Sequence, residues 1–228
     1  MCDQNKTEIV MIMDASGSMS GNRQRQAVSG YNEFIQEQKK VPGECNVTLI
    51  KFNTEIQEMY FSKPISEIKD LTIEDFNCDG QTAINDTMGH AINKLGERLR
   101  DLPEEQRPGK IIVVVLTDGE ENASREFNYE QIQEMMNHQR DVYNWQFLIM
   151  GSKEINASPD GHFAQMAGVQ GPCGPRGLQG DLGLDGTAQM MFSASSAAVT
   201  RYRSGATTAV GYQKEDVKDL NLVASNEN

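Results

Sequence analysis

Short apolar runs alternate with longer stretches of helical periodicity along this chain. Each run is too short for a helix and ends in turn residues, a pattern typical of buried strands in a parallel sheet. The runs cover residues 8–13, 47–52, 56–61, 111–116 and 145–150. The fourth run has six consecutive apolar residues, mostly β-branched, and predicts a central strand that is buried on both faces. The second and third runs are separated only by residues 53–55 and predict a hairpin.

Between these runs the apolar residues recur at helical spacing. The spacing predicts helices over residues 23–40, 83–99, 129–139 and 187–203, and a short helix over 162–167. Residues 62–81 show neither period and predict a mixed connection. Strands that alternate with helices predict the α/β class: a doubly wound, mostly parallel central sheet with helices on both faces, in three layers.

A chain of 228 residues is long enough for one large domain, whereas two domains would each be short of core. We therefore expect a single domain over residues 7–205, preceded by a short lead of residues 1–6. Residues 206–228 are polar and acidic and are expected to form a loosely held tail.

Charge and targeting signals narrow the functional classes. Acidic residues outnumber basic ones by 33 to 21, which gives a formal net charge of −12. Nucleic acids and anionic membranes bind basic surfaces, so we expect neither as a partner. The first apolar run is short and ends at Asp14, and nowhere does the chain reach the ~20 apolar residues of a membrane span. Four widely spaced cysteines without a CxxC pair indicate reduced thiols, and we expect a cytoplasmic protein.

Glycines at strict intervals of three mark residues 168–186, inside the expected domain. This is the period of collagen, because only glycine fits the axis of a triple helix. The proline content is below that of collagen, and a triple helix needs three chains. We predict an extended, polyproline-like surface loop that replaces or shortens the last edge strand, in a monomeric protein. A trimer formed through the Gly-x-y segment is the alternative.

Polar residues with metal-binding chemistry follow the predicted strands. Asp14 ends the first strand and is followed by Ser16 and Ser18, Asp118 ends the central strand, and Thr82 precedes a helix. In a doubly wound sheet, ligands bind outside the carboxyl ends of the strands. Carboxylate and hydroxyl oxygens without histidine or cysteine favour a hard cation, Mg²⁺ with Mn²⁺ or Ca²⁺ as substitutes, over zinc.

Three sequence elements carry a resemblance to a known family: Asp14-Ala15-Ser16-Gly17-Ser18, Thr82 before a helix, and Leu116-Thr117-Asp118-Gly119. Together they resemble the metal-ion-dependent adhesion site of von Willebrand factor A domains, over about residues 7–205. The chain is identified as an intracellular, bacterial or phage-like member of that family. The resemblance implies that the three hydroxyl groups bind the metal directly and that the two aspartates act mainly through bound water. It also implies an open coordination position for a carboxylate of a partner protein.

The expected function is that of an adhesion-type module, which captures an Asp or Glu side chain of a partner protein through Mg²⁺. The alternatives are a regulatory or assembly subunit acting with an ATPase and, third, a metal-dependent phosphoryl hydrolase. Phosphatases of the haloacid dehalogenase type are typified by the pattern DxDxT, in which the second aspartate is a general acid. Here Ser16 stands at that second position, and a serine cannot perform that role. The chain has no GxxxxGK[ST] and no GxGxxG after a strand. We therefore expect no enzyme, and neither catalytic nor cofactor-binding residues.

The remaining polar and sulfur-containing residues predict structural roles. Residues 120–122 (Glu-Glu-Asn) extend an acidic loop and are expected to be solvated rather than bound to metal. The three histidines have no partner at ligand spacing. The methionines stand at core positions and are expected to serve packing.

Overall fold

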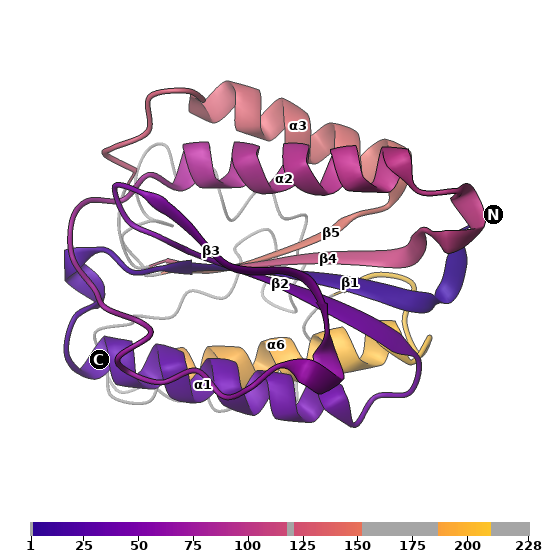
Figure 1. The fold of residues 1–228 in the computed structure, drawn as a ribbon, viewed down its shortest axis with the longest axis horizontal. Helices are drawn as coiled ribbons and strands as arrows, with labels where there is room; N and C mark the ends of the chain where they lie inside the picture. Colours follow the sequence, from indigo (N-terminus) through magenta and orange to yellow (C-terminus); the bar gives the residue numbers. More distant parts are fainter. Residues whose placement is uncertain (1, 118–120, 152–186, 211–228) are drawn as a thin grey trace, which may run out of the picture.

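A five-stranded sheet forms the middle layer of the protein (Figure 1), in the strand order β3-β2-β1-β4-β5. The computed structural model describes residues 2–117, 121–151 and 187–210. The strands are β1 (Asp3–Asp14), β2 (Glu44–Phe52), β3 (Ile56–Pro64), β4 (Pro108–Thr117) and β5 (Gln146–Gly151). Only β3 is antiparallel to its neighbour, and the other three pairings are parallel.

Helices cover both faces of this sheet. One face carries α1 (Asn22–Lys39) and α6 (Thr187–Arg203), and the opposite face carries α2 (Ile84–Asp101) and α3 (Tyr129–Tyr143) (Figure 1). Short 3-10 turns lie at Gly17–Met19, Ile65–Glu67 and Glu104–Gln106. The predicted three-layer α/β architecture is thus confirmed.

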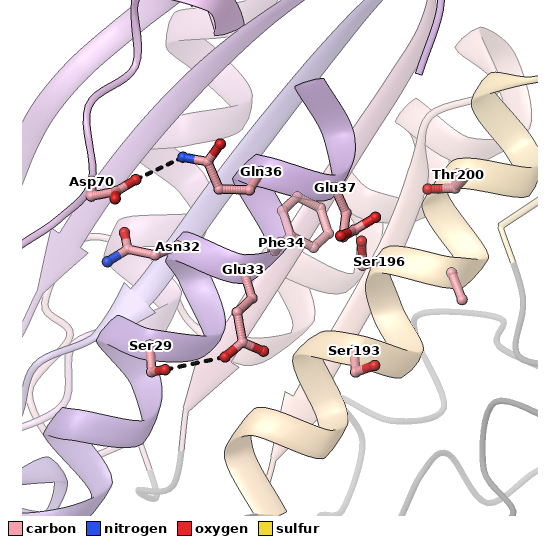
Figure 2. A pocket seen from close by; sticks show the side chains of 11 residues that line it. Ser29, Asn32, Glu33, Phe34, Gln36, Glu37, Asp70, Ser193, Ser196 and Thr200 are labelled. Carbon is pink, nitrogen blue, oxygen red and sulfur yellow. Dashed lines mark hydrogen bonds between the residues drawn. The ribbon is translucent and has the colours of Figure 1, made fainter. Parts of the chain in front are cut away.

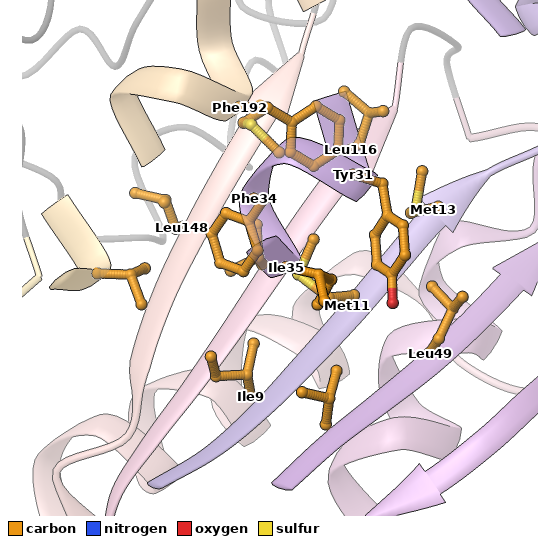
Figure 3. Packing of buried hydrophobic residues seen from close by; sticks show 14 of the residues in the cluster. Ile9, Met11, Met13, Tyr31, Phe34, Ile35, Leu49, Leu116, Leu148 and Phe192 are labelled. Atoms are coloured by element: carbon orange, nitrogen blue, oxygen red, sulfur yellow. The ribbon is translucent and has the colours of Figure 1, made fainter. Parts of the chain in front are cut away.

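The core divides into two clusters, one on each face of the sheet. Ile9, Met11 and Met13 of β1 pack with Phe34 and Phe192 on the α1/α6 side (Figure 3). The intervening residues of β1 join the cluster beneath α2 and α3. This alternation follows from the two-residue period of a strand, and it makes β1 fully buried from Ile9 onward. Met150 and Met191 are also buried, so their predicted role in packing is confirmed.

The element predictions hold, with differences at the ends. The hairpin at residues 53–55 and all four long helices are present, but α3 extends four residues further, to Tyr143. β1 begins at Asp3 rather than near residue 8, because its polar first half still pairs with neighbouring strands. The predicted helix over 162–167, the glycine triplets of 168–186 and the tail beyond residue 210 lie outside the described residues. Of the expected tail, Val210 is buried and its amide donates to Gln146 Oε1 (3.1 Å).

The strand order places a topological switch between β1 and β4. The chain leaves β1 through α1 towards β2 on one side, and later reaches β4 on the other side through α2. The loops that follow β1 and β4 therefore diverge, and such a point is where open α/β sheets bind ligands. Among the described helices, none has the length and apolar character needed to cross a membrane.

Candidate metal centre

Asp14 is the last residue of β1 and has no exposed surface. Its Oδ1 accepts a hydrogen bond from the backbone amide of Ser16 (2.7 Å), and its Oδ2 accepts one from the hydroxyl of Thr117 (2.6 Å). The carboxylate is therefore held by the turn after β1 and by the last residue of β4. The sequence predicted Asp14 at this position, but it did not predict the contact with Thr117.

Ser16 immediately precedes the 3-10 turn at Gly17–Met19, and Ser18 lies within that turn. Their hydroxyl oxygens lie 3.0 Å apart, with Ser16 buried and Ser18 exposed. Alternate residues of the turn thus direct two hydroxyl groups to one place, beside the buried carboxylate. This is the arrangement that the spacing Asp-x-Ser-x-Ser predicts.

Thr82 reaches the same end of the sheet through backbone contacts between two loops. The amide of Asp79 donates to the carbonyl of Ala15 (2.9 Å), and the amide of Gly17 donates to the carbonyl of Gly80 (3.1 Å). These bonds join the loop of residues 79–82 to the loop that carries Ser16. Thr82 itself is buried, two residues before the start of α2. The structure therefore brings Asp14, both serines and the Thr82 loop to one place.

Asp118, the fifth predicted site residue, lies outside the described residues. Its neighbour Thr117 ends β4 and contacts Asp14 directly, as described above. The sequence did contain a signal for this contact, because Thr117 stands directly between the buried run of residues 111–116 and the Asp-Gly pair.

The loop after residue 120 agrees with its prediction at Asn122, which is exposed, and differs from it at Glu121. Glu121 is half-buried, and its carboxylate accepts four hydrogen bonds, from the amides of Asn85, Ala123 and Ser124 and from the Ser124 hydroxyl. The expectation that this side chain is solvated is therefore wrong. Two of the donor residues, Ala123 and Ser124, lie in the same loop as Glu121, and the third, Asn85, lies on α2. No local pattern in the sequence indicates the contact with Asn85.

The described donor set fits a hard divalent cation. It consists of the Asp14 carboxylate and the hydroxyl groups of Ser16, Ser18 and Thr82, and oxygen ligands of this kind are those that Mg²⁺ and Ca²⁺ take. In residues 2–117, 121–151 and 187–210, no three His, Cys, Asp or Glu side chains form a group that could hold a metal. The described donors thus combine one carboxylate with neutral hydroxyls, and a nearby cation would remain electrophilic toward a further anion.

A separate groove of about 710 Å³ lies between α1 and α6 (Figure 2). It contains none of the predicted site residues. Its carboxylates have partners within the protein: Glu33 accepts from Ser29 (3.3 Å), Asp70 accepts from Gln36 (2.8 Å), and Glu37 pairs with Lys40 (2.5 Å). Internal partners account for these polar groups, so we assign the groove no ligand.

Two of the histidines lie within the described residues. His90 is partly exposed on α2, with its Nε2 3.9 Å from Glu58, and the ring of His138 contacts Tyr143 on α3. Neither belongs to the loops around Asp14.

Comparison with known proteins places these observations in a family. Residues 8–166 match the profile of the von Willebrand factor type A domain. No curated protein matches the chain.

Solved structures provide likenesses of fold. A von Willebrand factor type A protein from Catenulispora acidiphila is 12% identical with a TM-score of 0.55, over 88% of this chain and 43% of that one. Proximal thread matrix protein 1 from the mussel byssus, with a zinc-occupied MIDAS motif, is 19% identical with a TM-score of 0.44, over 64% of this chain and 35% of that one. The chain thus spans less than half the length of either protein.

Proposed function

Because the chain belongs to the von Willebrand factor type A domain family, we propose that it is a metal-dependent protein-binding module. One observation carries the proposal: the buried carboxylate of Asp14 lies beside a pair of serine hydroxyls 3.0 Å apart, at the topological switch of the sheet. A carboxylate that neutralises part of a cation's charge, with hydroxyls that leave it electrophilic, suits the capture of a further anion.

In this proposal Ser16, Ser18 and Thr82 bind the cation directly, and Asp14 and Asp118 hold it mainly through water. The metal supplies a Lewis-acidic position for one more oxygen ligand. Mg²⁺ is the proposed ion, because all the donors are oxygen atoms, and Mn²⁺ or Ca²⁺ are the expected substitutes. The residues of this chain supply orientation: Thr117 and the Ser16 amide each hold one oxygen of the Asp14 carboxylate.

The proposed partner is a protein that presents an Asp or Glu side chain. The chain carries a net charge of −12, so its overall field repels an acidic ligand. A local divalent cation reverses this preference at one place only. Capture of an acidic group is therefore expected to depend on the metal rather than to be merely strengthened by it.

We propose binding without a chemical step. A second aspartate placed two residues after Asp14 would supply a general acid, and this chain has Ser16 there, whose hydroxyl does not ionise near neutral pH. Both oxygens of the Asp14 carboxylate also accept hydrogen bonds within the protein, which fits a fixed support better than a nucleophile.

Selection from a displayed library of random peptides, performed with the purified chain in Mg²⁺, tests this function. Selected peptides are expected to share one Asp or Glu whose change to Asn or Gln abolishes binding. Their binding should be lost in EDTA and restored by Mg²⁺.

Two variants provide the comparison. Asp14→Ala is expected to bind none of the selected peptides, whereas Asp101→Ala, at an exposed aspartate at the end of α2, should bind them as the wild type does. Peptides that bind equally well in EDTA, or that contain no essential acidic residue, would contradict the proposed function.

A further inference from the structure

The loop of residues 121–127, which follows the loop carrying Asp118, is bound to the first turn of α2. The amide of Asn85 donates to Glu121 Oε2 (2.9 Å), and the amide of Asp86 donates to Ser124 Oγ (3.0 Å). Amides in the first turn of a helix have no partner within the helix. The residue before α2 is Ala83, whose side chain cannot cap them. A distant loop therefore provides the N-terminal cap of α2.

The loop also donates hydrogen bonds to the helix. The carboxylate of Asp86 accepts three consecutive backbone amides of the loop, from Arg125 (2.7 Å), Glu126 (2.9 Å) and Phe127 (2.9 Å). The Phe127 ring then packs against Gly89, where a Cβ atom would lie 2.5 Å from the ring. The loop and the helix thus hold each other along the whole segment.

Asn122 connects this clamp to the candidate metal centre. Its side-chain Oδ1 accepts the amide of Thr82 (2.9 Å), and its own amide donates to the carbonyl of Thr82 (3.1 Å). One residue therefore fixes both backbone polar groups of a predicted metal ligand. Because Thr82 is also buried, its backbone can shift little without breaking this pair of hydrogen bonds.

We propose that residues 121–127 form a positioning clamp for the metal centre, in which Glu121 and Asn122 act through Thr82 without binding the cation. The inference rests on the proposed metal site. The clamp joins Thr82 and the first turn of α2 to residues 121–127. A predicted metal ligand is thereby held in one position relative to that segment.

Linkage gives the clamp a second, measurable consequence. If the clamp favours the metal-binding arrangement, metal binding must favour the clamp by the same free energy. Mg²⁺ is therefore expected to slow hydrogen exchange at the amides of Asn85 and Asp86, although neither amide belongs to a metal ligand.

Glu121→Gln tests the clamp most directly. Each oxygen of Glu121 accepts at least one backbone amide, so whichever oxygen becomes NH₂ will face an N–H donor. Glu126→Gln is the matched control: it makes the same change in the same loop, at an exposed carboxylate for which the described residues provide no side-chain hydrogen bond or ion pair. Asn122→Ala removes only the side-chain contact to Thr82, and Asn122→Asp restores an acceptor there.

Isothermal titration with Mg²⁺, with hydrogen exchange on the same samples, measures the effect. Glu121→Gln and Asn122→Ala are expected to bind Mg²⁺ about 10-fold more weakly, in the range usual for residues that orient metal ligands. Glu126→Gln should bind as the wild type does, and Asn122→Asp at least as tightly, because it restores the acceptor and adds a negative charge beside Thr82. Mg²⁺ should slow exchange at Asn85 and Asp86 in the wild type and not in Glu121→Gln.

The possible failures are distinguishable. Unchanged Mg²⁺ affinity in folded Glu121→Gln and Asn122→Ala, beside a wild type that binds Mg²⁺, would overturn the clamp alone. A wild type that binds no Mg²⁺ would overturn the metal site and the clamp together. If Glu121→Gln does not fold, Asn122→Ala decides, because Asn122 is exposed and its substitution leaves the cap of α2 intact.

Discussion

The carboxylate of Asp14 is held by two donors, one in the turn just after β1 and one at the end of β4. The Ser16 amide binds one oxygen and the Thr117 hydroxyl binds the other, so each carboxylate oxygen has a fixed direction. A hydrogen bond to a charged group contributes about 1.5–3 kcal/mol. The Thr117 contact is therefore large enough to affect how a cation binds.

Thr117→Val removes this hydroxyl with little change in volume. Mg²⁺ affinity is expected to fall about 10-fold or more, because Asp14 loses the donor that orients it. Calorimetric titration measures the change. Thr7→Val is the control, since Thr7 is also buried but lies on β1, seven residues before Asp14. Equal losses in both variants would attribute the effect to general packing.

A second buried carboxylate, Glu8, has a structural role of its own. It is 1% exposed, accepts a hydrogen bond from Ser62 Oγ (2.9 Å) and lies 3.5 Å from Arg98 of α2. Burial raises the pKa of Glu8 above its ordinary value of 4.5, and the Arg98 guanidinium only partly opposes that effect. The neutral form is thus favoured in the folded protein relative to the unfolded chain.

The sign of the resulting pH dependence follows from linkage. A raised folded pKa gives a stabilising contribution that is complete below pH 4.5 and is lost as the pH rises through the folded pKa of Glu8. Glu8→Gln cannot ionise and loses nothing over that range. Urea unfolding of both proteins is expected to show the variant gaining free energy of unfolding relative to the wild type as pH rises from 4.5 to 7.5. A difference that stays constant or moves the other way would contradict this account.

Some of these residues could be predicted from the sequence and others could not. Asp14 and Ser16 follow from the rule that strand ends carry the site, whereas Thr82 precedes a helix and was assigned through the family resemblance. Glu121 and Asn122 could not be assigned, because their partners on α2 and at Thr82 are about 40 residues away. Such contacts depend on how two loops meet, and a local pattern of residues does not contain that information.

At the scale of elements, the contact between α1 and α6 depends on the absence of a side chain. A Cβ atom on Gly30 of α1 would lie 2.4 Å from the ring of Phe192 on α6. That ring is fully buried and makes an edge contact with Phe34 at 6.4 Å. The two helices can therefore approach closely only because position 30 is glycine.

Gly30→Ala is expected to destabilise the fold by about 1–3 kcal/mol, as overpacking of a filled core does. Gly96→Ala makes the same change on α2, where nothing lies within 4 Å of the new methyl group. It should stabilise the protein by about 0.5–1 kcal/mol through helix propensity alone. Thermal or urea unfolding measures both. If both variants change the free energy of unfolding in the same direction, the contact with Phe192 does not decide the effect.

Helices and strands were predictable to the extent that burial imposes a period on them. The strand over 111–116 and the helix at Thr187–Arg203 are present where the apolar pattern indicates them. The last turn of α3 was missed because Val142 and Tyr143 are 60% exposed there and add nothing to the apolar face. The first half of β1 was missed because backbone pairing, rather than burial, defines it.

For the whole molecule, strand order decides where the chemistry lies. The sheet order brings the ends of β1 and β4 together, and the loop before α2 is bonded to the loop after β1. The proposed site, drawn from three separate parts of the chain, thus rests on the buried ends of β1 and β4. Since the chain carries a net charge of −12, a divalent cation at this point changes the local sign of the field where an acidic partner would approach.

Calorimetric titration of the wild type and of Asp14→Ala with Mg²⁺ at neutral pH tests the central claim most directly. The wild type is expected to bind one Mg²⁺ per chain. Asp14→Ala should show no binding while retaining the circular dichroism of the folded protein. A folded Asp14→Ala variant that binds Mg²⁺ as tightly as the wild type, or a wild type that binds none, would contradict the assignment of the metal centre.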